Sequence, residues 1–325
     1  MSINQTVTHT TSPSWRPVLV FVAIAYALAW LISIPLWLTG GLTSPFFVIV
    51  ALLTMFTPMI AAALTVRFVE HSPLLDAWGW RVRSPWLKRT TATTLLTWLI
   101  LFTAIMVALA ISALFGTYIF DIAGMSAFRA LIEAQSAAQG ATSNIPDGAL
   151  RAIWISQLAM IIPASFINAI PAMGEEAGWR GFLLPRLIDL VGHRSAILLM
   201  GPIWGLWHAP LLLLGYNYPM NPVLGLLMMS VFCTGVGAIL AWATLRTGNS
   251  FAAALGHGFI NSALPSLMLA LASDAQPVDT VFATLMGFAG WPVLAVMTLW
   301  ALFSLTRAGR ESQVTPAPMS SQPSK

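Results

Sequence analysis

A few side chains that could do chemistry lie inside strongly apolar stretches of this sequence, where ionisable groups are costly. They are Glu175, Glu176, Arg180, His208, His257 and Asn261. A carboxylate, two imidazoles and an amide can together activate a water molecule and stabilise the oxyanion that forms when water attacks a carbonyl. The residue types therefore predict hydrolysis by an activated water.

The stretch from Gly174 to Arg180 assigns roles by its spacing. Glu176 and Arg180 are four residues apart, share a helix face and can form an ion pair. Glu175 is rotated by about 100° from Glu176 and is left without that partner. A carboxylate that is desolvated and unpaired suits a general base, so we assign that role to Glu175 and a supporting role to the pair. The alternative is that all three charges only mark the membrane interface.

The two histidines each have a companion one helical turn away. Trp204 precedes His208 by four residues, which predicts an aromatic wall beside the imidazole. Asn261 follows His257 by four residues, so one face offers an imidazole and an amide. Such a face could hold a water, a metal ion or a developing oxyanion.

Two ways of activating the water remain open at the level of residue types. In one, Glu175, His208 and His257 bind a Zn ion whose open position holds the water. In the other no metal is used: Glu175 and His208 activate the water, and His257 with Asn261 stabilises the oxyanion.

Other protease motifs are missing from the sequence. It has no H-E-x-x-H for a zincin-like site and no G-x-G-D for an aspartyl site. The stretch Gly248-Asn249-Ser250 approaches a serine-protease motif but lacks its last glycine, and we expect Ser250 to cap a helix instead. The single cysteine, Cys233, excludes an internal disulfide and a cysteine cluster for metal.

Composition identifies the elements that must position these side chains as membrane helices. Hydrophobic residues make up 58% of the 325 residues and charged residues 8%, against about 25% charged in soluble domains. So few charges cannot cover a water-facing surface, which excludes a soluble protein. The net charge of +4 does not indicate nucleic acid, because the basic residues are distributed as topology signals.

A span needs about 20 apolar residues, and about eight stretches qualify, which predicts an all-α membrane bundle. Residues 15–307 form the membrane domain, and we expect the tails 1–14 and 308–325 to be disordered and residues 116–150 to form a long outer loop. The predicted spans are residues 17–38, 45–67, 91–115, 157–184, 196–214, 222–245, 250–272 and 280–306.

Basic residues predict the orientation of these spans. With eight crossings and a cytoplasmic N-terminus, every Lys and Arg except Arg129 and Arg151 falls on the cytoplasmic side. Both termini are therefore expected in the cytoplasm. The pattern fits a multi-pass protein of a cell membrane, and a bacterial inner membrane in particular.

Taken together, the motifs resemble the CPBP family (CAAX proteases and bacteriocin-processing enzymes, also called Abi), which includes the type II CAAX prenyl endopeptidases. The matching motifs are E-E-x-x-x-R at Glu175–Arg180, aromatic-x-x-x-H at Trp204–His208 and H-x-x-x-N at His257–Asn261. The similarity covers roughly residues 150–270. One departure is Trp204, where the family usually has Phe.

The resemblance implies eight helices and an intramembrane endopeptidase whose site opens to the cytosol. It implies Glu175 as base, His208 and His257 at the water or oxyanion, and Asn261 in support, with a metal-dependent and a metal-free mechanism both open. The expected partners are the lipid bilayer and a membrane protein or peptide substrate, not nucleic acid. The alternatives are a non-catalytic bacteriocin self-immunity or scaffold protein, and a proton-coupled transporter. Neither the substrate nor the oligomeric state follows from the sequence.

Overall fold

The computed structural model describes residues 13–80, 86–140 and 145–314, and the side chains of these ranges up to residue 305. Residues 1–12 and 315–325, which make up most of the two predicted tails, lie outside the described residues. In chain order the helical elements are α1 (Trp15–Leu38), η1 (Gly41–Thr43), α2 (Phe47–Met55), α3 (Thr57–Thr65), η2 (Val66–Glu70), α4 (Leu74–Ala77), α5 (Trp86–Leu114), α6 (Ser126–Ala138), α7 (Asp147–Ala159), α8 (Ile161–Glu176), η3 (Ala177–Leu183), α9 (Leu184–Trp207), α10 (Ala209–Leu212), α11 (Pro222–Thr247), α12 (Phe251–Ala270), η4 (Phe288–Gly290) and α13 (Trp291–Val314).

The all-helical prediction is confirmed for the described part of the chain, where extended pairing is limited to an isolated bridge between Phe120 and Ala272. Within the described residues, five helical stretches are long and apolar enough to cross a membrane, or six if the bent pair of α7 and the helix from Ile161 to Trp207 forms one span. The protein is therefore a multi-pass membrane protein. The predicted count of about eight spans stays a prediction. α12 is not among these stretches, because His257, Asn261 and its small polar residues lower its mean hydropathy.

Three predicted boundaries differ from the structure. The span predicted over 280–306 does not begin as a helix: residues 280–287 form turns, and the long helix starts only at Trp291. A Cβ at Gly287 would lie 2.6 Å from the carbonyl oxygen of Thr280, so this apolar segment folds tightly back on itself. The predicted outer loop 116–150 contains α6 and the start of α7, and α13 continues into the predicted tail as far as Val314.

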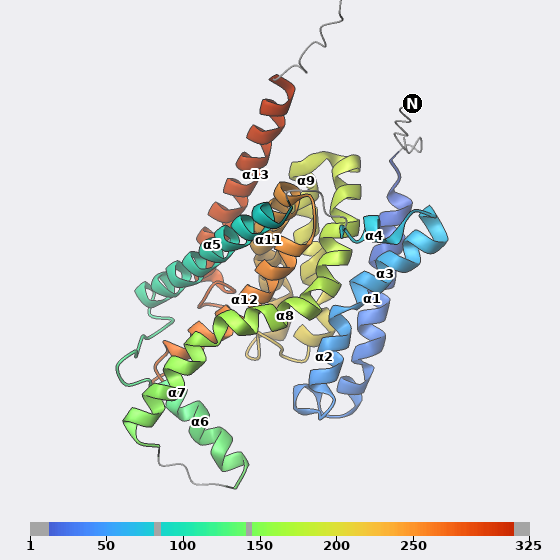
Figure 1. The fold of residues 1–325 in the computed structure, drawn as a ribbon. Helices are drawn as coiled ribbons and strands as arrows, with labels where there is room; N and C mark the ends of the chain where they lie inside the picture. Colours follow the sequence, from blue (N-terminus) through green and yellow to red (C-terminus); the bar gives the residue numbers. More distant parts are fainter. Residues whose placement is uncertain (1–12, 81–85, 141–144, 315–325) are drawn as a thin grey trace, which may run out of the picture.

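The centre of the bundle is built from two closely packed helix pairs, α8 with α12 and α9 with α11 (Figure 1). A Cβ at Gly258 of α12 would lie 2.3 Å from the carbonyl oxygen of Ser165 on α8, and one at Gly205 of α9 would lie 2.5 Å from Cα of Ser230 on α11. Only glycine permits such close backbone approach, as is common between membrane helices. These contacts fix the positions of the helices that carry the candidate site.

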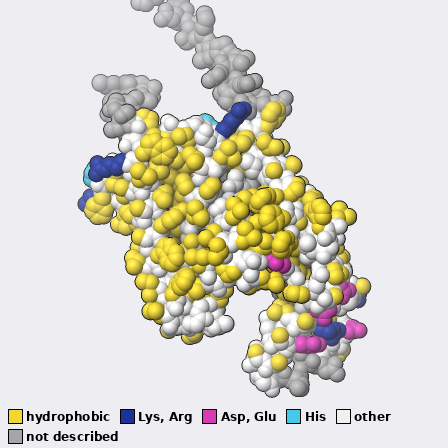
Figure 2. All heavy atoms as spheres, turned by 180° about the vertical axis from the view of Figure 1, so that it is seen from behind, with side chains coloured by type: hydrophobic (Ala, Val, Ile, Leu, Met, Phe, Trp, Pro, Cys, Tyr) yellow, Lys and Arg dark blue, Asp and Glu magenta, His cyan; other side chains and the backbone are white. Residues whose placement is uncertain are grey.

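The outer surface of the molecule is mostly apolar. Figure 2 shows hydrophobic side chains over most of one face, with basic side chains near one end and a mixed acidic and basic group on the lobe at the other end. That lobe holds α6 and α7 and contains the ion pair between Arg129 and Asp147, at 2.5 Å. Figure 1 places the start of α1 and the end of α13 at the same end of the bundle.

Candidate active site

Three helices carry the predicted site residues and bring four of them, Glu175, Glu176, Arg180 and His257, into the interior of the bundle. Glu175 and Glu176 end α8, and Arg180 lies in the π-helical segment η3 that follows. The exposed fractions of these three side chains are 2%, 0% and 1%. His208 directly follows α9 and is half-buried, and His257 is buried on α12. A short π-helical segment inside a longer helix is often found at functional sites.

The predicted ion pair of Glu176 and Arg180 is confirmed. Nη1 of Arg180 donates to Oε1 of Glu176 at 2.7 Å, and both side chains are fully enclosed. The same Oε1 lies 2.8 Å from Nδ1 of His257, a contact between α8 and α12 that the sequence did not predict. Glu176 therefore joins a guanidinium and an imidazole, and its support reaches His257 as well as Arg180.

Glu175 has no ion-pair partner among the described residues, as predicted, but it does accept one hydrogen bond. Nε1 of Trp204 donates to Oε2 of Glu175 at 2.8 Å in the buried interior. The prediction assigned Trp204 only an aromatic role. The signal in the sequence was the replacement of Phe by Trp in the second motif, because only Trp carries an N–H that can reach a carboxylate.

Trp204 also contacts the other charged and titratable members of the site. The guanidinium carbon of Arg180 lies 4.3 Å from the centre of its ring, and the imidazole of His257 packs at 5.2 Å with an angle of 72°. Its carbonyl oxygen lies 2.9 Å from Nδ1 of His208. One residue therefore positions Glu175, Arg180, His208 and His257 relative to one another.

The contacts of the two imidazoles define which nitrogen is free. A carbonyl oxygen can only accept, so Nδ1 of His208 carries a proton and donates to Trp204. Nε2 of a neutral His208 is then an acceptor. Nδ1 of His257 faces the carboxylate of Glu176 and donates in the same way, which leaves Nε2 of His257 for a ligand or substrate.

Asn261 makes no hydrogen bond to this cluster in the described structure. It is exposed and lines a small cavity between α8 and α12, and the described structure gives its side chain no hydrogen bond to His257. The predicted shared face of His257 and Asn261 holds for the helix, and the joint action of the two side chains on one atom stays a prediction.

The donor set does not fit a three-ligand metal site in this geometry. Within the described residues, no three His, Cys, Asp or Glu side chains converge closely enough to hold a metal ion. Nδ1 of each histidine contacts a protein oxygen and Oε2 of Glu175 accepts from Trp204, so Nε2 of each histidine and Oε1 of Glu175 remain as donor atoms, and these do not converge on one point. The Zn hypothesis for Glu175, His208 and His257 therefore finds no support in the arrangement of the ligands.

Ser250 does not cap α12 with its side chain, contrary to the sequence-based expectation. Its hydroxyl donates to the carbonyl oxygen of Trp78 at 3.0 Å, whereas Oδ1 of Asn249 accepts from the backbone N–H of Phe251 at 3.1 Å. The tertiary contact with the segment after α4 competes with local capping. Ser250 therefore ties α12 to that segment.

Comparison with known proteins places this site in context. A family model described as type II CAAX prenyl endopeptidase Rce1-like matches residues 154–263. The chain is also similar to CAAX prenyl protease 2 of Methanococcus maripaludis, with 28% identity over 130 residues, or 37% of this chain and 45% of that protein. The chain thus spans less than half the length of this relative. The family model covers every predicted site residue, from Glu175 to Asn261. The predicted resemblance to the CAAX protease family is therefore confirmed over this central segment.

Proposed function

We propose that this chain is a membrane-embedded endopeptidase that hydrolyses a peptide bond with a water molecule activated by Glu175. The observation that carries the proposal is the buried hydrogen bond from Trp204 to Oε2 of Glu175. It fixes the carboxylate and leaves Oε1 with no hydrogen bond in the described structure. A fixed carboxylate oxygen without a protein partner can accept a proton from water.

The chemistry needs one base and one acceptor for the same water. Glu175 takes a proton through Oε1, and Nε2 of His208 accepts the second hydrogen of the water and orients it. The water oxygen attacks the carbonyl carbon of the scissile bond, whose oxygen becomes an oxyanion. The C–N bond then breaks, and the amine leaves with the proton returned from Glu175, so that one water is consumed for each bond cut.

The oxyanion requires a donor, and His257 is the proposed source. Its Nδ1 is held by Glu176, and the Glu176–Arg180 pair keeps that carboxylate in place. Nε2 of His257 is on the side of the ring away from Glu176. When this nitrogen carries a proton, it can donate to the oxyanion. Asn261 would assist from the adjacent turn of α12. Glu176, Arg180 and Trp204 position these groups and do not themselves touch the substrate.

No step of this proposal passes through a metal ion, because the ligand geometry does not fit one. The substrate is proposed to be a membrane protein or peptide that reaches the site from the cytosolic side of a cell membrane. The relative's name concerns prenylated proteins. Whether this chain requires a prenyl group is therefore part of the test.

The test compares membranes from cells that lack the native protein and express the wild type, Glu175→Gln or Glu133→Gln. Glu133 is an exposed glutamate on α6 and serves as the matched control for the charge change. We expect new peptide termini with the wild type and Glu133→Gln that are lost with Glu175→Gln. Substrates found this way are then resynthesised with and without a C-terminal prenyl cysteine.

Two outcomes would contradict the proposal. Cleavage by Glu175→Gln at the wild-type rate would show that Glu175 is not the base. Identical sets of peptide termini in all three membranes would favour the non-catalytic alternative, a self-immunity or scaffold protein of the same fold.

A further inference from the structure

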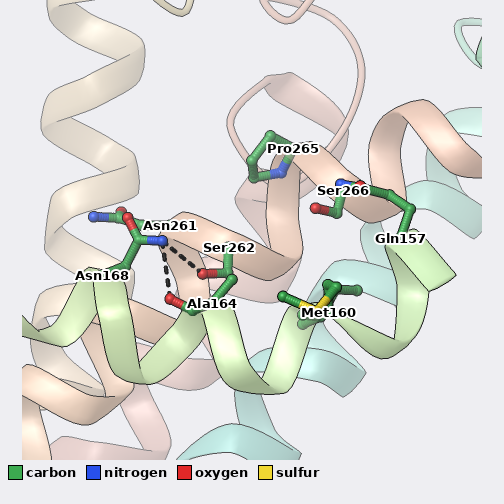
Figure 3. Close-up of a pocket in the computed structure, with 9 residues that line it drawn as sticks. Gln157, Met160, Ala164, Asn168, Asn261, Ser262, Pro265 and Ser266 are labelled. Carbon is green, nitrogen blue, oxygen red and sulfur yellow. Dashed lines mark hydrogen bonds between the residues drawn. The ribbon is translucent and has the colours of Figure 1, made fainter. Parts of the chain in front are cut away.

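A polar cavity of about 220 Å³ lies between α7–α8 and α12, in a region whose exposed neighbours are apolar. Its polar lining consists of amides and hydroxyls: Gln157, Asn168, Asn261, Ser262 and Ser266. Figure 3 shows Asn168 and Asn261 next to each other at one end and Gln157 and Ser266 at the other. The exposed neighbours of this lining on α8, such as Phe166 and Ile167, are apolar. An uncharged polar groove thus interrupts an apolar surface.

Only some of the polar groups in this lining form hydrogen bonds within the protein. Nδ2 of Asn168 donates to the carbonyl oxygen of Ala164 and to the hydroxyl of Ser262, both at 3.0 Å. Within the described residues the side chains of Gln157, Asn261 and Ser266 make no hydrogen bond. Leaving amide and hydroxyl groups unpaired in a hydrocarbon environment is unfavourable. A polar occupant of the groove would remove that cost.

The groups that line the groove select the class of occupant. Each free amide offers both a donor and an acceptor, as a peptide backbone does, and the cavity lining contains no charged side chain to hold a phosphate or a cation. Main-chain hydrogen bonds to an extended segment are a common mode of peptide recognition. Apolar residues, including Met160 and Pro265, line the rest of the cavity and suit apolar side chains of such a segment.

The groove is aligned with the proposed site along both helices. Asn168 precedes Glu175 by seven residues on α8, which is two turns on the same face and about 10 Å along the axis. Asn261 follows His257 by four residues on α12, or about 6 Å. A segment lying in the groove would therefore reach the scissile position in an extended conformation.

We propose that the α8–α12 groove binds the backbone of the substrate on one side of the scissile bond, with Gln157 and Ser266 as its outer contacts. This inference rests on the proposed function and assigns a subsite to it. Neither of these two residues belongs to the catalytic cluster, and neither holds helices together through a hydrogen bond.

The test measures KM and kcat for Gln157→Leu and Ser266→Ala with a substrate obtained from the membrane comparison. Each lost neutral hydrogen bond is worth about 1 kcal/mol, so KM should rise about fivefold in each variant while kcat stays unchanged. Ser156→Ala is the matched control, because the Ser156 hydroxyl donates to the carbonyl of Ala152 and does not line the cavity. A substrate shortened on the groove side should bind all three variants equally.

A binding readout keeps the test independent of turnover. In the Glu175→Gln protein, Ser266→Cys should crosslink to a peptide that carries a thiol-reactive group, and Ser156→Cys should not; the native Cys233 is buried. If Glu175-dependent cleavage occurs but both variants keep the wild-type KM, the groove proposal is wrong and the proposed function stands. Equal crosslinking at positions 156 and 266 would also overturn the groove proposal. Water or lipid would then be the occupant of the groove.

Discussion

The hydrogen bond between Trp204 and Glu175 can be removed with little other change by Trp204→Phe. The variant keeps an aromatic ring beside Arg180 and His257 but loses the N–H that donates to Oε2 at 2.8 Å. Phe is also the residue that the family usually has at this position, so we expect the variant to fold.

The size of the effect follows from the charge of the acceptor. Hydrogen bonds to charged groups contribute about 1.5–3 kcal/mol, and each 1.4 kcal/mol is tenfold in a rate, so kcat should fall about 10- to 150-fold. KM should stay within about twofold, because the ring does not touch the substrate.

Trp207→Phe is the control for the change of ring size. Trp207 is equally buried on α9, but its Nε1 donates to the neutral hydroxyl of Thr57 at 3.1 Å. Loss of this bond should reduce the free energy of unfolding by about 1 kcal/mol and leave kcat nearly unchanged. The reasoning fails if Trp204→Phe retains the wild-type kcat, or if both variants lose kcat equally.

Three further predictions concern the ion pair, the metal and the carboxylate of Asp121. Arg180→Met should lower the free energy of unfolding in detergent by about 3–5 kcal/mol, because Glu176 is left buried without its cation. Adding Glu176→Gln should restore most of that free energy. Equal stability of the single and double variants would argue against the pair. A strong Zn chelator should leave turnover of the purified protein unchanged, and loss of stoichiometric Zn together with activity would refute the metal-free route. The hydrogen bonds of Ser126 and Gly124 to Asp121 lower the pKa of that carboxyl. The segment 121–126 should therefore keep its hydrogen-exchange protection until the pH falls below the ordinary carboxyl range. In Ser126→Ala, this protection should be lost at a higher pH than in the wild type. An unshifted profile in that variant would show that the bond has no such effect.

The sequence was sufficient for features that depend on local spacing. The Glu176–Arg180 pair was predictable because both residues lie one turn apart on the same helix, so no knowledge of the tertiary fold was needed. The helical class followed from hydropathy in the same way. The failed prediction over 280–306 shows the limit of that signal, because a buried turn can be as apolar as a helix.

Contacts between distant helices could not be predicted. Trp204 meets Glu175 across 29 positions, and His257 meets Glu176 across 81, so both depend on how α8, α9 and α12 pack. The spacing rule placed Asn261 beside His257, but that rule says nothing about which side chain the neighbouring helix will contact. The partner of each histidine therefore emerged only from the fold.

The π-helical segment Ala177–Leu183 has a consequence for how this protein can change over evolutionary time. Removing or adding one residue there would rotate everything on one side by about 100° relative to the other. Gly178 and Gly181 are also pressed against Pro58 and Trp78, so the shift could not be absorbed by displacing the backbone. The length of this segment is therefore fixed, as are its two glycines. In a homologue with an insertion or deletion here, the two glutamates would no longer face Trp204 and His257.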